Sequence, residues 1–473
     1  MISVAGIGLC TAQGTAAEIL AEGELARPRS LPWPPSPRAT CTIGFAARGI
    51  DPDLRGAARW RALADAALAE LGGRRDVPIV VGSCNGGADG DEAGWRTAFG
   101  ALGIEGPIAS AACASGIHAL WLAMTRIAAG EDEVIVLAVD ILSRANHDNF
   151  EALRVLAIEP APWQATSSGF IPGEAAVALR LVRAREGDGL SRLALPVLAH
   201  DRDGVDALGD VVRAVVGNGV DSRVAMVVGQ GSGPSVVDER ELAALRGSVA
   251  DDVPLSTALT AFGHTVGASS LLSVALAALI NRQGATDAGG TELPLTPPVP
   301  WRFFSAGVAV DGRPLGAAPG TALVACRALG GACAATVLGV TTAAARRASV
   351  APGWSPPSLV PPLRIPRLRQ LAGEAIEHRP GNPPDVLIVR LDEPLVPPAD
   401  AWIGGRLLPS VALEITPGFI AQLVARAWGY RGSALCLVGG SDAAWLPTLA
   451  ACRRVHGTVL VLHVHGGGLG WSA

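Results

Sequence analysis

The sequence predicts an α/β fold in which helices pack against mostly buried sheets, and three observations indicate it. Short runs rich in Val, Ile, Leu and Ala alternate with longer Ala- and Leu-rich stretches of helical length. Hydrophobic residues make up 49% of the 473-residue chain and charged residues only 17%, so the chain can bury a large core and is not expected to be disordered. The alternation also occurs twice in succession, which indicates two α/β halves over residues 1 to about 340.

Each half is expected to combine buried strands with amphipathic or buried helices. Continuous apolar runs bounded by polar or Gly residues are typical of strands covered on both faces. In the first half we expect strands at 2–9, 77–82, 133–140 and 175–182 and helices at 59–71 and 116–130. In the second half we expect strands at 223–229, 321–328 and 334–340 and helices at 238–247 and 267–284.

A third unit follows a proline-rich segment. Residues 351–367 carry six prolines, which favours an extended linker over a packed element. After it we expect helices at 367–377 and 418–429 and strands at 385–391 and 458–464, followed by a Gly-rich, mobile end. The predicted domains are therefore 1–190, 191–340, a linker at 341–366, and 367–473.

Composition excludes several classes of protein. A net charge of −5 and a pI near 5.9 give no basic surface for nucleic acid. The longest apolar run, at 271–280, is too short to span a bilayer, and the first residues do not resemble a signal peptide. Eight scattered cysteines form no C-x₂-C pair, so we expect no metal and no organic cofactor in a cytoplasmic protein with reduced thiols.

Cys113 is the first candidate for chemistry. It lies in "AACASGIHAL" (111–120), among small residues and directly before a helical pattern. A thiol near a helix N-terminus is favoured as a thiolate by the helix dipole. Free cysteines are also commonly buried as small hydrophobic residues, so the motif alone leaves both interpretations open.

Two Gly-rich stretches supply further candidates. His264 lies between Gly263 and Thr265 in "FGHTVGASS", just before a helix, where an imidazole can project into a cavity. Gln230 lies in "GQGSGPSVVDERE" (229–241), with acidic residues eight and eleven positions later, at Asp238 and Glu241.

Five motifs in this order resemble those of the β-ketoacyl synthases, the condensing enzymes of fatty-acid and polyketide synthesis. They are "ACASGIHAL" for the nucleophile, "SSGFIPGEAAVALRL" (167–181), "GQGSGPSVVDERE" for the first histidine, "GHTVGASS" for the second and "RALGGACAATVL" (327–338) for the C-terminal glycine motif. The resemblance implies a thiolase-like fold of two related α/β halves, and a homodimer or a heterodimer with another ketosynthase-like chain.

The resemblance also implies roles for individual residues. Cys113 would take an acyl group from an acyl-carrier-protein thioester. Backbone N–H groups of Cys113 and of the loop Leu329, Gly330 and Gly331 would hold the oxyanion. His264 would act as hydrogen-bond donor and base, and the substrates would arrive on the carrier protein's phosphopantetheine.

Three departures from the family pattern affect the expected activity. The first family histidine is Gln230, the lysine five residues before the second is Leu259, and the phenylalanine-rich gate is Ala328 and Leu329. Glutamine donates a hydrogen bond but cannot become a cation or shuttle a proton. Family members without the first histidine are often non-elongating. We therefore expect a ketosynthase-like acyltransferase whose decarboxylative condensation is impaired.

Two alternatives remain open. The first is that the chain is a non-catalytic subunit, similar to a chain-length factor, that pairs with an active ketosynthase. The retention of Cys113 argues against this alternative. A third possibility is that Cys113 passes its acyl group to an alcohol or amine. The segment 367–473 resembles a degenerate ketosynthase. At its nucleophile position it has "VGGSD" (438–442), where Ser441 is expected to be a loop residue.

Overall fold

The computed structural model describes most of the chain in several stretches. The described residues are 2–21, 25–33, 39–74, 76–84, 100, 102–164, 166, 168–184, 191–201, 206–217, 224–251, 253–285, 321–328, 330–339, 352, 366–377, 379–392, 402–403, 406–407, 416–465 and 468–472. The predicted linker at 341–366 lies outside them except for Pro352 and Pro366.

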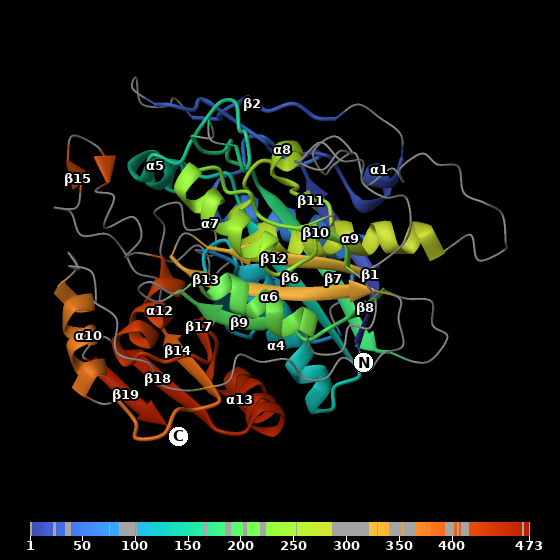
Figure 1. Ribbon diagram of the computed structural model, residues 1–473. Helices are drawn as coiled ribbons and strands as arrows, with labels where there is room; N and C mark the ends of the chain where they lie inside the picture. The colour runs from blue at the N-terminus through green and yellow to red at the C-terminus, as the bar shows by residue number, and fades with distance from the viewer. Residues whose placement is uncertain are drawn as a thin grey trace.

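The described elements follow the predicted alternation of strands and helices (Figure 1). The first half contains β1 (Ile2–Thr11), α1 (Ala16–Leu20), β2 (Arg29–Ser30), β3 (Ile43–Gly44), α2 (Gly56–Ala69), β4 (Ile79–Gly82), β5 (Ile108–Ser110), α4 (Ser115–Ala129), β6 (Glu133–Asp140), α5 (Arg144–Leu153) and β7 (Ala175–Arg183). The second contains β8 (Ser191–Leu193), β9 (Val197–His200), α6 (Ala207–Gly217), β10 (Val224–Val228), α7 (Ser235–Arg246), β11 (Leu255–Ser256), α8 (Leu259–Phe262), η1 (Val266–Ala268), α9 (Ser269–Ala285), β12 (Thr321–Arg327) and β13 (Ala332–Gly339). The C-terminal unit contains α10 (Pro366–Glu377), β14 (Val386–Leu391), β15 (Trp402–Ile403), β16 (Arg406–Leu407), α12 (Pro417–Trp428), β17 (Ser433–Val438), α13 (Asp442–His456), β18 (Val459–His465) and β19 (Gly468–Ser472).

One strand pattern occurs three times in the 15-stranded sheet. In the first half the order is β5-β4-β6-β7, with β4 parallel to β5 and β6, and β6 antiparallel to β7. The second half repeats it as β11-β10-β12-β13, with the same directions. The C-terminal unit repeats it again as β17-β14-β18-β19. The chain therefore holds two full halves and a third, shorter copy.

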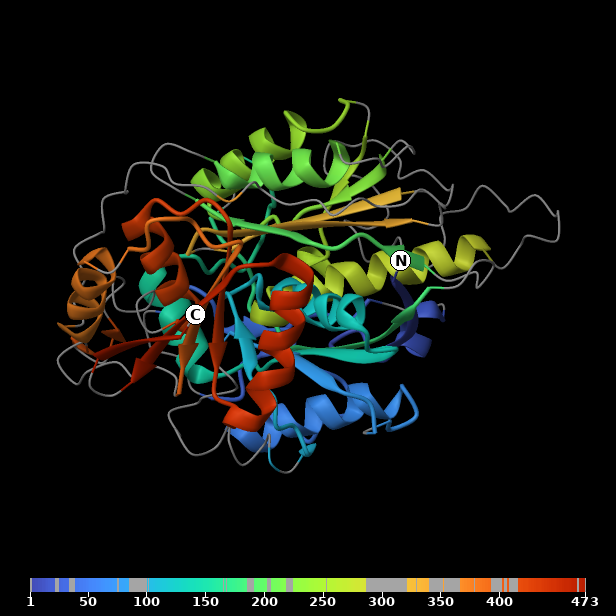
Figure 2. The ribbon, with the colours of Figure 1, turned by 90° about the horizontal axis from the view of Figure 1, so that it is seen from below.

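The two halves form layers around buried central helices (Figure 2). α9 packs against β12 and β13 on one side and against β7 and α4 on the other, while α2 packs on the strands of the first half and α6 on those of the second. Nearly every residue of α4 from Ser115 to Ile127 is buried, as expected of a helix that is apolar all round. This layered α/β arrangement agrees with the predicted fold class.

The C-terminal unit extends the sheet of the first half. β17 pairs antiparallel with β5, with Cys436 opposite Ser110 and Val438 opposite Ile108, and α13 packs against α4. Elements that hold the same place in two copies of the pattern thus meet, which is the form of an isologous two-fold interface. The exposed edge that β5 would offer to another strand is covered within the chain.

Two segments of the C-terminal unit, its Gly-rich end and the turn at Ser441, can be compared with the sequence predictions. The Gly-rich end was predicted to be mobile; its described part forms the strand β19, which pairs with β18. Ser441 lies at the N-cap of α13 and accepts a hydrogen bond from the Ala444 N–H at 3.3 Å. The segment "VGGSD" therefore joins β17 to α13 just as the Cys113 segment joins β5 to α4.

Candidate functional site

Cys113 lies in a strained turn between β5 and α4. Ala112 has φ of 49°, in the left-handed region that costs an L-residue roughly 1–2 kcal/mol. The Ser115 hydroxyl holds this turn: it accepts from the Ala111 N–H at 2.9 Å and donates to the Ala112 carbonyl at 2.6 Å. Cys113 itself is only 2% exposed. It lines a cavity next to this turn.

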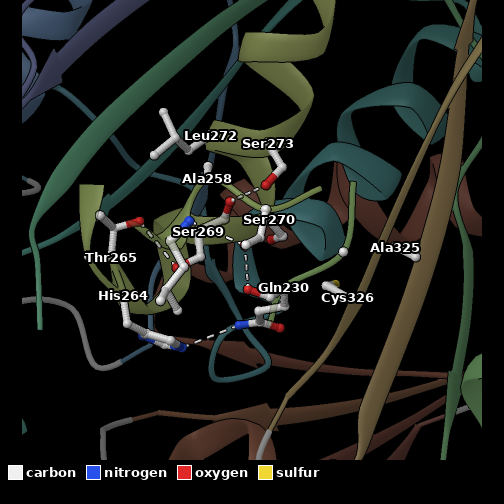
Figure 3. Close-up of a pocket in the computed structure, with 14 residues that line it drawn as sticks. Gln230, Ala258, His264, Thr265, Ser269, Ser270, Leu272, Ser273, Ala325 and Cys326 are labelled. Atoms are coloured by element: carbon white, nitrogen blue, oxygen red, sulfur yellow. Dashed lines mark hydrogen bonds between the residues drawn. The ribbon is translucent and has the colours of Figure 1, made fainter. Parts of the chain in front are cut away.

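Gln230 and His264 come from different loops and meet in one pocket (Figure 3). The amide nitrogen of Gln230 lies 3.3 Å from Nε2 of His264. Gln230 follows β10, and His264 lies between α8 and η1, where its N–H donates to the Ile171 carbonyl at 2.8 Å. Both side chains are buried. The structure thus brings together two of the three residues predicted to be catalytic.

The hydrogen bonds around His264 fix where its proton lies. The Val266 N–H donates to Nδ1 at 3.2 Å, so in the neutral ring Nε2 carries the proton. A protonated Nε2 needs an acceptor, and the amide of Gln230 supplies one when its oxygen and nitrogen are exchanged by a 180° rotation. In that orientation Oε1 accepts from Nε2, and the NH₂ group points toward the pocket as a donor.

Burial keeps His264 neutral. Its ring stacks on Phe170 with the centroids 4.2 Å apart, and Phe150 lies edge-on at 5.9 Å. Desolvation by these surroundings lowers the pKa of His264 to about 4. At neutral pH the ring is therefore a hydrogen-bond donor without charge.

Two buried carboxyl groups hold the loop that carries Gln230. Glu241 accepts from the N–H groups of Gln230 at 2.7 Å and Gly231 at 2.8 Å, and from Nε1 of Trp163 at 2.9 Å. Burial raises the pKa of Glu241 to about 7. Asp238 accepts from the N–H groups of Trp163 and Gly233, both at 2.8 Å. These contacts give both groups a structural role in fixing the loop.

Cys113 lines a second cavity, beside the pocket that holds Gln230 and His264. Cys326 lines the Gln230 pocket, and the nearby thiol of Cys113 is one cause of its raised pKa, after burial. Val266, two residues after His264, lines the cavity of Cys113. The two cavities are therefore neighbours.

The three residues predicted to hold the oxyanion or substrate differ in position. Leu329 lies outside the described residues. Gly330 lines the cavity of Cys113. Gly331 has φ of 94°, its N–H donates to the Ala328 carbonyl at 2.8 Å and its carbonyl accepts from the Asp201 N–H at 2.7 Å. Gly331 is thus a turn residue whose N–H is already paired.

Sequence reasoning missed several residues of the cavity. Cys84 lines it, and burial raises the pKa of that thiol well above its usual value, with Asp140 and Cys113 as further causes. Phe419 and Gln422 of α12 also line it, although they lie about 300 residues from Cys113. In the sequence, Gln422 is marked only as one of two polar residues, with Arg426, in an apolar helix.

Metal binding and membrane spanning are two further properties that can be judged within the described ranges. There, no group of three or more His, Cys, Asp and Glu side chains is arranged to hold a metal ion. No helix in the same ranges has the length and apolar character needed to cross a membrane.

The comparisons with known proteins agree with this geometry. Residues 96–187, which include β5, Cys113, α4, β6 and β7, match the family model "Beta-ketoacyl synthase, N-terminal domain". The match covers about a fifth of the chain, the part that carries Cys113. Among curated proteins no sequence matches it.

Solved structures show the ketosynthase fold at low identity. A ketosynthase in complex with its chain length factor from Xenorhabdus doucetiae is similar with a TM-score of 0.55 and 20% identity, over 72% of this chain and 98% of that one. A β-ketoacyl synthase from Burkholderia phymatum STM815 gives 0.55 and 18%, over 72% and 99%. The structure named PfaC keto synthase-chain length factor gives 0.69 and 13%, over 99% of this chain and 74% of that one. The whole described chain, C-terminal unit included, thus has counterparts of the same fold.

Proposed function

We propose that this protein is a ketosynthase-like acyltransferase that acts on acyl-carrier-protein thioesters in fatty-acid-like or polyketide biosynthesis. The observation that carries the proposal is the position of Cys113, held in a strained turn at the start of α4 and facing a cavity shared with Gly330. A nucleophile needs both an activating environment and space for its substrate. The helix N-terminus favours the thiolate, and the cavity lies beside the sulfur, where the acyl group would be bound.

The acyl-transfer step balances without a cofactor. The Cys113 sulfur attacks the thioester carbonyl, and the tetrahedral oxyanion forms beside the turn that carries Gly330. The bond from the carbonyl carbon to the carrier's phosphopantetheine sulfur then breaks. The departing thiolate takes up the proton lost by Cys113, which leaves the acyl group on Cys113 and a free carrier thiol.

The Gln230–His264 pair limits the second step expected of a condensing enzyme. Both groups are neutral at pH 7, since Gln230 has no titratable group and the pKa of His264 is about 4. They stabilise an enolate by hydrogen bonds but supply neither a cation nor a mobile proton. Loss of a group that transfers a proton lowers the rate of a step that needs general acid–base catalysis by roughly a factor of 10² to 10⁴. We infer that acyl transfer is retained and that elongation is slow.

The C-terminal unit fits the place of a second ketosynthase-like unit. It repeats the strand pattern of the first half and pairs through β17 with β5. The PfaC structure, which combines a ketosynthase and a chain length factor, is similar over 99% of this chain, whereas the two shorter ketosynthase chains account for 72%. We infer that this unit acts in the same chain as a truncated partner.

The second candidate function is that of a non-catalytic, chain-length-factor-like subunit. Burial of Cys113 to 2% exposure favours it, because a thiol that no carrier arm reaches would be inert. Coverage of the β5 edge by β17 argues against it. A homodimer or heterodimer with another ketosynthase-like chain would have to use a surface other than this edge.

Intact-protein mass spectrometry after incubation with acyl-carrier thioesters tests the proposal. The wild type and the Cys452→Ala variant, which removes a buried thiol of α13, should gain the mass of one acyl group. The Cys113→Ala variant should gain none. Equal labelling of the Cys113→Ala variant, or no labelling of the wild type by any donor, would overturn it in favour of the subunit.

A further inference from the structure

The cavity beside Cys113 has a lining that the two ketosynthase halves do not complete alone. The first half contributes Asn146, Asn149 and Phe150 among others, and the second half contributes Val266 and Gly330. Three further lining residues, Thr416, Phe419 and Gln422, come from the C-terminal unit. The lining of this cavity is therefore built by all three parts of the chain.

Helix α12 is held firmly against the turn that carries Cys113. A β-carbon at Gly418 would lie only 2.6 Å from Cα of Ala111, so the helix backbone packs directly on the turn. Two helical turns further on, Nε of Arg426 donates to the Asp201 carbonyl at 3.1 Å. Gln422 lies between these two anchors, and its position is therefore fixed by the packing of the helix.

Gln422 carries a polar group without a polar partner. It is 4% exposed, and neither Nε2 nor Oε1 has a hydrogen-bond partner in the described part of the chain. Its amide lies against the turn of Gly330, where a β-carbon would be 2.7 Å from Oε1. Buried amide groups are nearly always hydrogen-bonded, because leaving them unpaired is costly. The unused donor and acceptor of Gln422 are therefore available to a polar group that enters the cavity.

We propose that Gln422 recognises a hydroxyl group on the acyl chain bound at Cys113, so that the protein selects hydroxylated acyl groups over saturated ones. This inference rests on the proposed function. A hydroxyl both donates and accepts, so it satisfies Oε1 and Nε2 together, whereas a keto oxygen satisfies only Nε2 and an alkyl chain neither. Asn146, Asn149 and Thr416 give the same cavity further polar lining.

The test compares acylation rates of Cys113 with matched donors. The donors are β-hydroxyacyl, δ-hydroxyacyl, β-ketoacyl and saturated acyl groups of one chain length on one carrier protein. The wild type should react about tenfold faster with at least one hydroxyacyl donor than with the saturated donor, as expected for one or two hydrogen bonds. Gln422→Leu should lose this preference, so that the hydroxyacyl and saturated donors react with it at equal rates. The control Gln370→Leu, at an exposed glutamine of α10, should behave as the wild type.

Each outcome separates the two proposals. Absence of an adduct with every donor refutes the proposed function itself. An adduct formed at equal rates from hydroxyacyl and saturated donors overturns only the role of Gln422. If Gln422→Leu slows all donors by the same factor, Gln422 contacts the carrier arm's amide groups and the proposal is also wrong. A cooperative urea denaturation curve and a wild-type circular dichroism spectrum show that the Gln422→Leu variant is folded.

Discussion

The contact between α12 and the Cys113 turn makes a sharp prediction for Gly418→Ala. The added β-carbon would lie 2.6 Å from Cα of Ala111, 2.7 Å from the Ser110 carbonyl oxygen and 2.9 Å from the Ala111 nitrogen. These are backbone atoms of a turn that is already strained, so they cannot move aside as a flexible side chain can. Overpacking of this kind costs roughly 1–3 kcal/mol.

Helix propensity acts in the opposite direction, and the structure decides which effect is larger. Alanine stabilises a helix interior by about 1 kcal/mol relative to glycine, and Gly418, the second residue of α12, gains at most that amount. Three backbone atoms lie within 3.0 Å of the added β-carbon, which places the packing cost at the upper end of its range. After the gain in helix propensity is subtracted, we expect Gly418→Ala to lower the free energy of unfolding by about 1–2 kcal/mol. It should also change the rate at which Cys113 reacts with an acyl donor.

A matched glycine supplies the control. Gly373 lies in the exposed face of α10, and a β-carbon there would meet no atom within 4 Å. Gly373→Ala should therefore raise the free energy of unfolding by up to about 1 kcal/mol. Urea denaturation of the two variants and the wild type measures both effects. A Gly418→Ala variant as stable as the wild type would refute the direct packing of α12 on the turn.

Three further predictions concern residues around the site. Ser115→Ala leaves the buried Ala111 N–H unpaired, and urea denaturation should show a loss of about 1–3 kcal/mol; an unchanged stability would contradict the role of this hydroxyl. Gln230→His should raise the release of carbon dioxide from malonyl carrier protein by a factor of about 10² or more, measured in a coupled assay; no increase would show that another group limits the step. The pKa of Glu241 is raised to about 7, so between pH 4.5 and 7 this carboxyl is protonated in the folded protein and ionised in the unfolded one. The contribution of Glu241 to the free energy of unfolding therefore falls as pH rises through that range. Relative to Glu241→Gln, the wild type should therefore lose up to about 3 kcal/mol of unfolding free energy from pH 4.5 to 8; a constant difference in denaturation midpoints would contradict a buried, shifted carboxyl.

Local patterns in the sequence predicted most elements of the two halves. The apolar run at 133–140 is β6, and the helix expected at 116–130 is α4, since both are buried on all sides and their composition shows it. The Cys113 turn was also marked by its small residues. The strain at Ala112 and the hydroxyl of Ser115 that holds it required the structure, because φ angles depend on the packing around the turn.

Long-range pairing was beyond sequence reasoning. Nothing in the run at 433–438 indicated that it would pair with β5, which lies more than 300 residues earlier, and this pairing brings Gln422 to the cavity of Cys113. The glycines of 466–470 suggested an irregular end, yet β19 forms by backbone pairing to β18, which needs no side chains. Tertiary contacts in both cases outweighed local propensity.

The central claim, that Cys113 is the residue that carries the acyl group, is tested most directly by locating the group. The protein is incubated briefly with an acyl-carrier thioester and digested, and the peptides are sequenced by mass spectrometry. We predict that the acyl group is found on the peptide containing Cys113 and not on those of its neighbours Cys84 and Cys326. An acyl group on either neighbour, with Cys113 unmodified, would contradict the account.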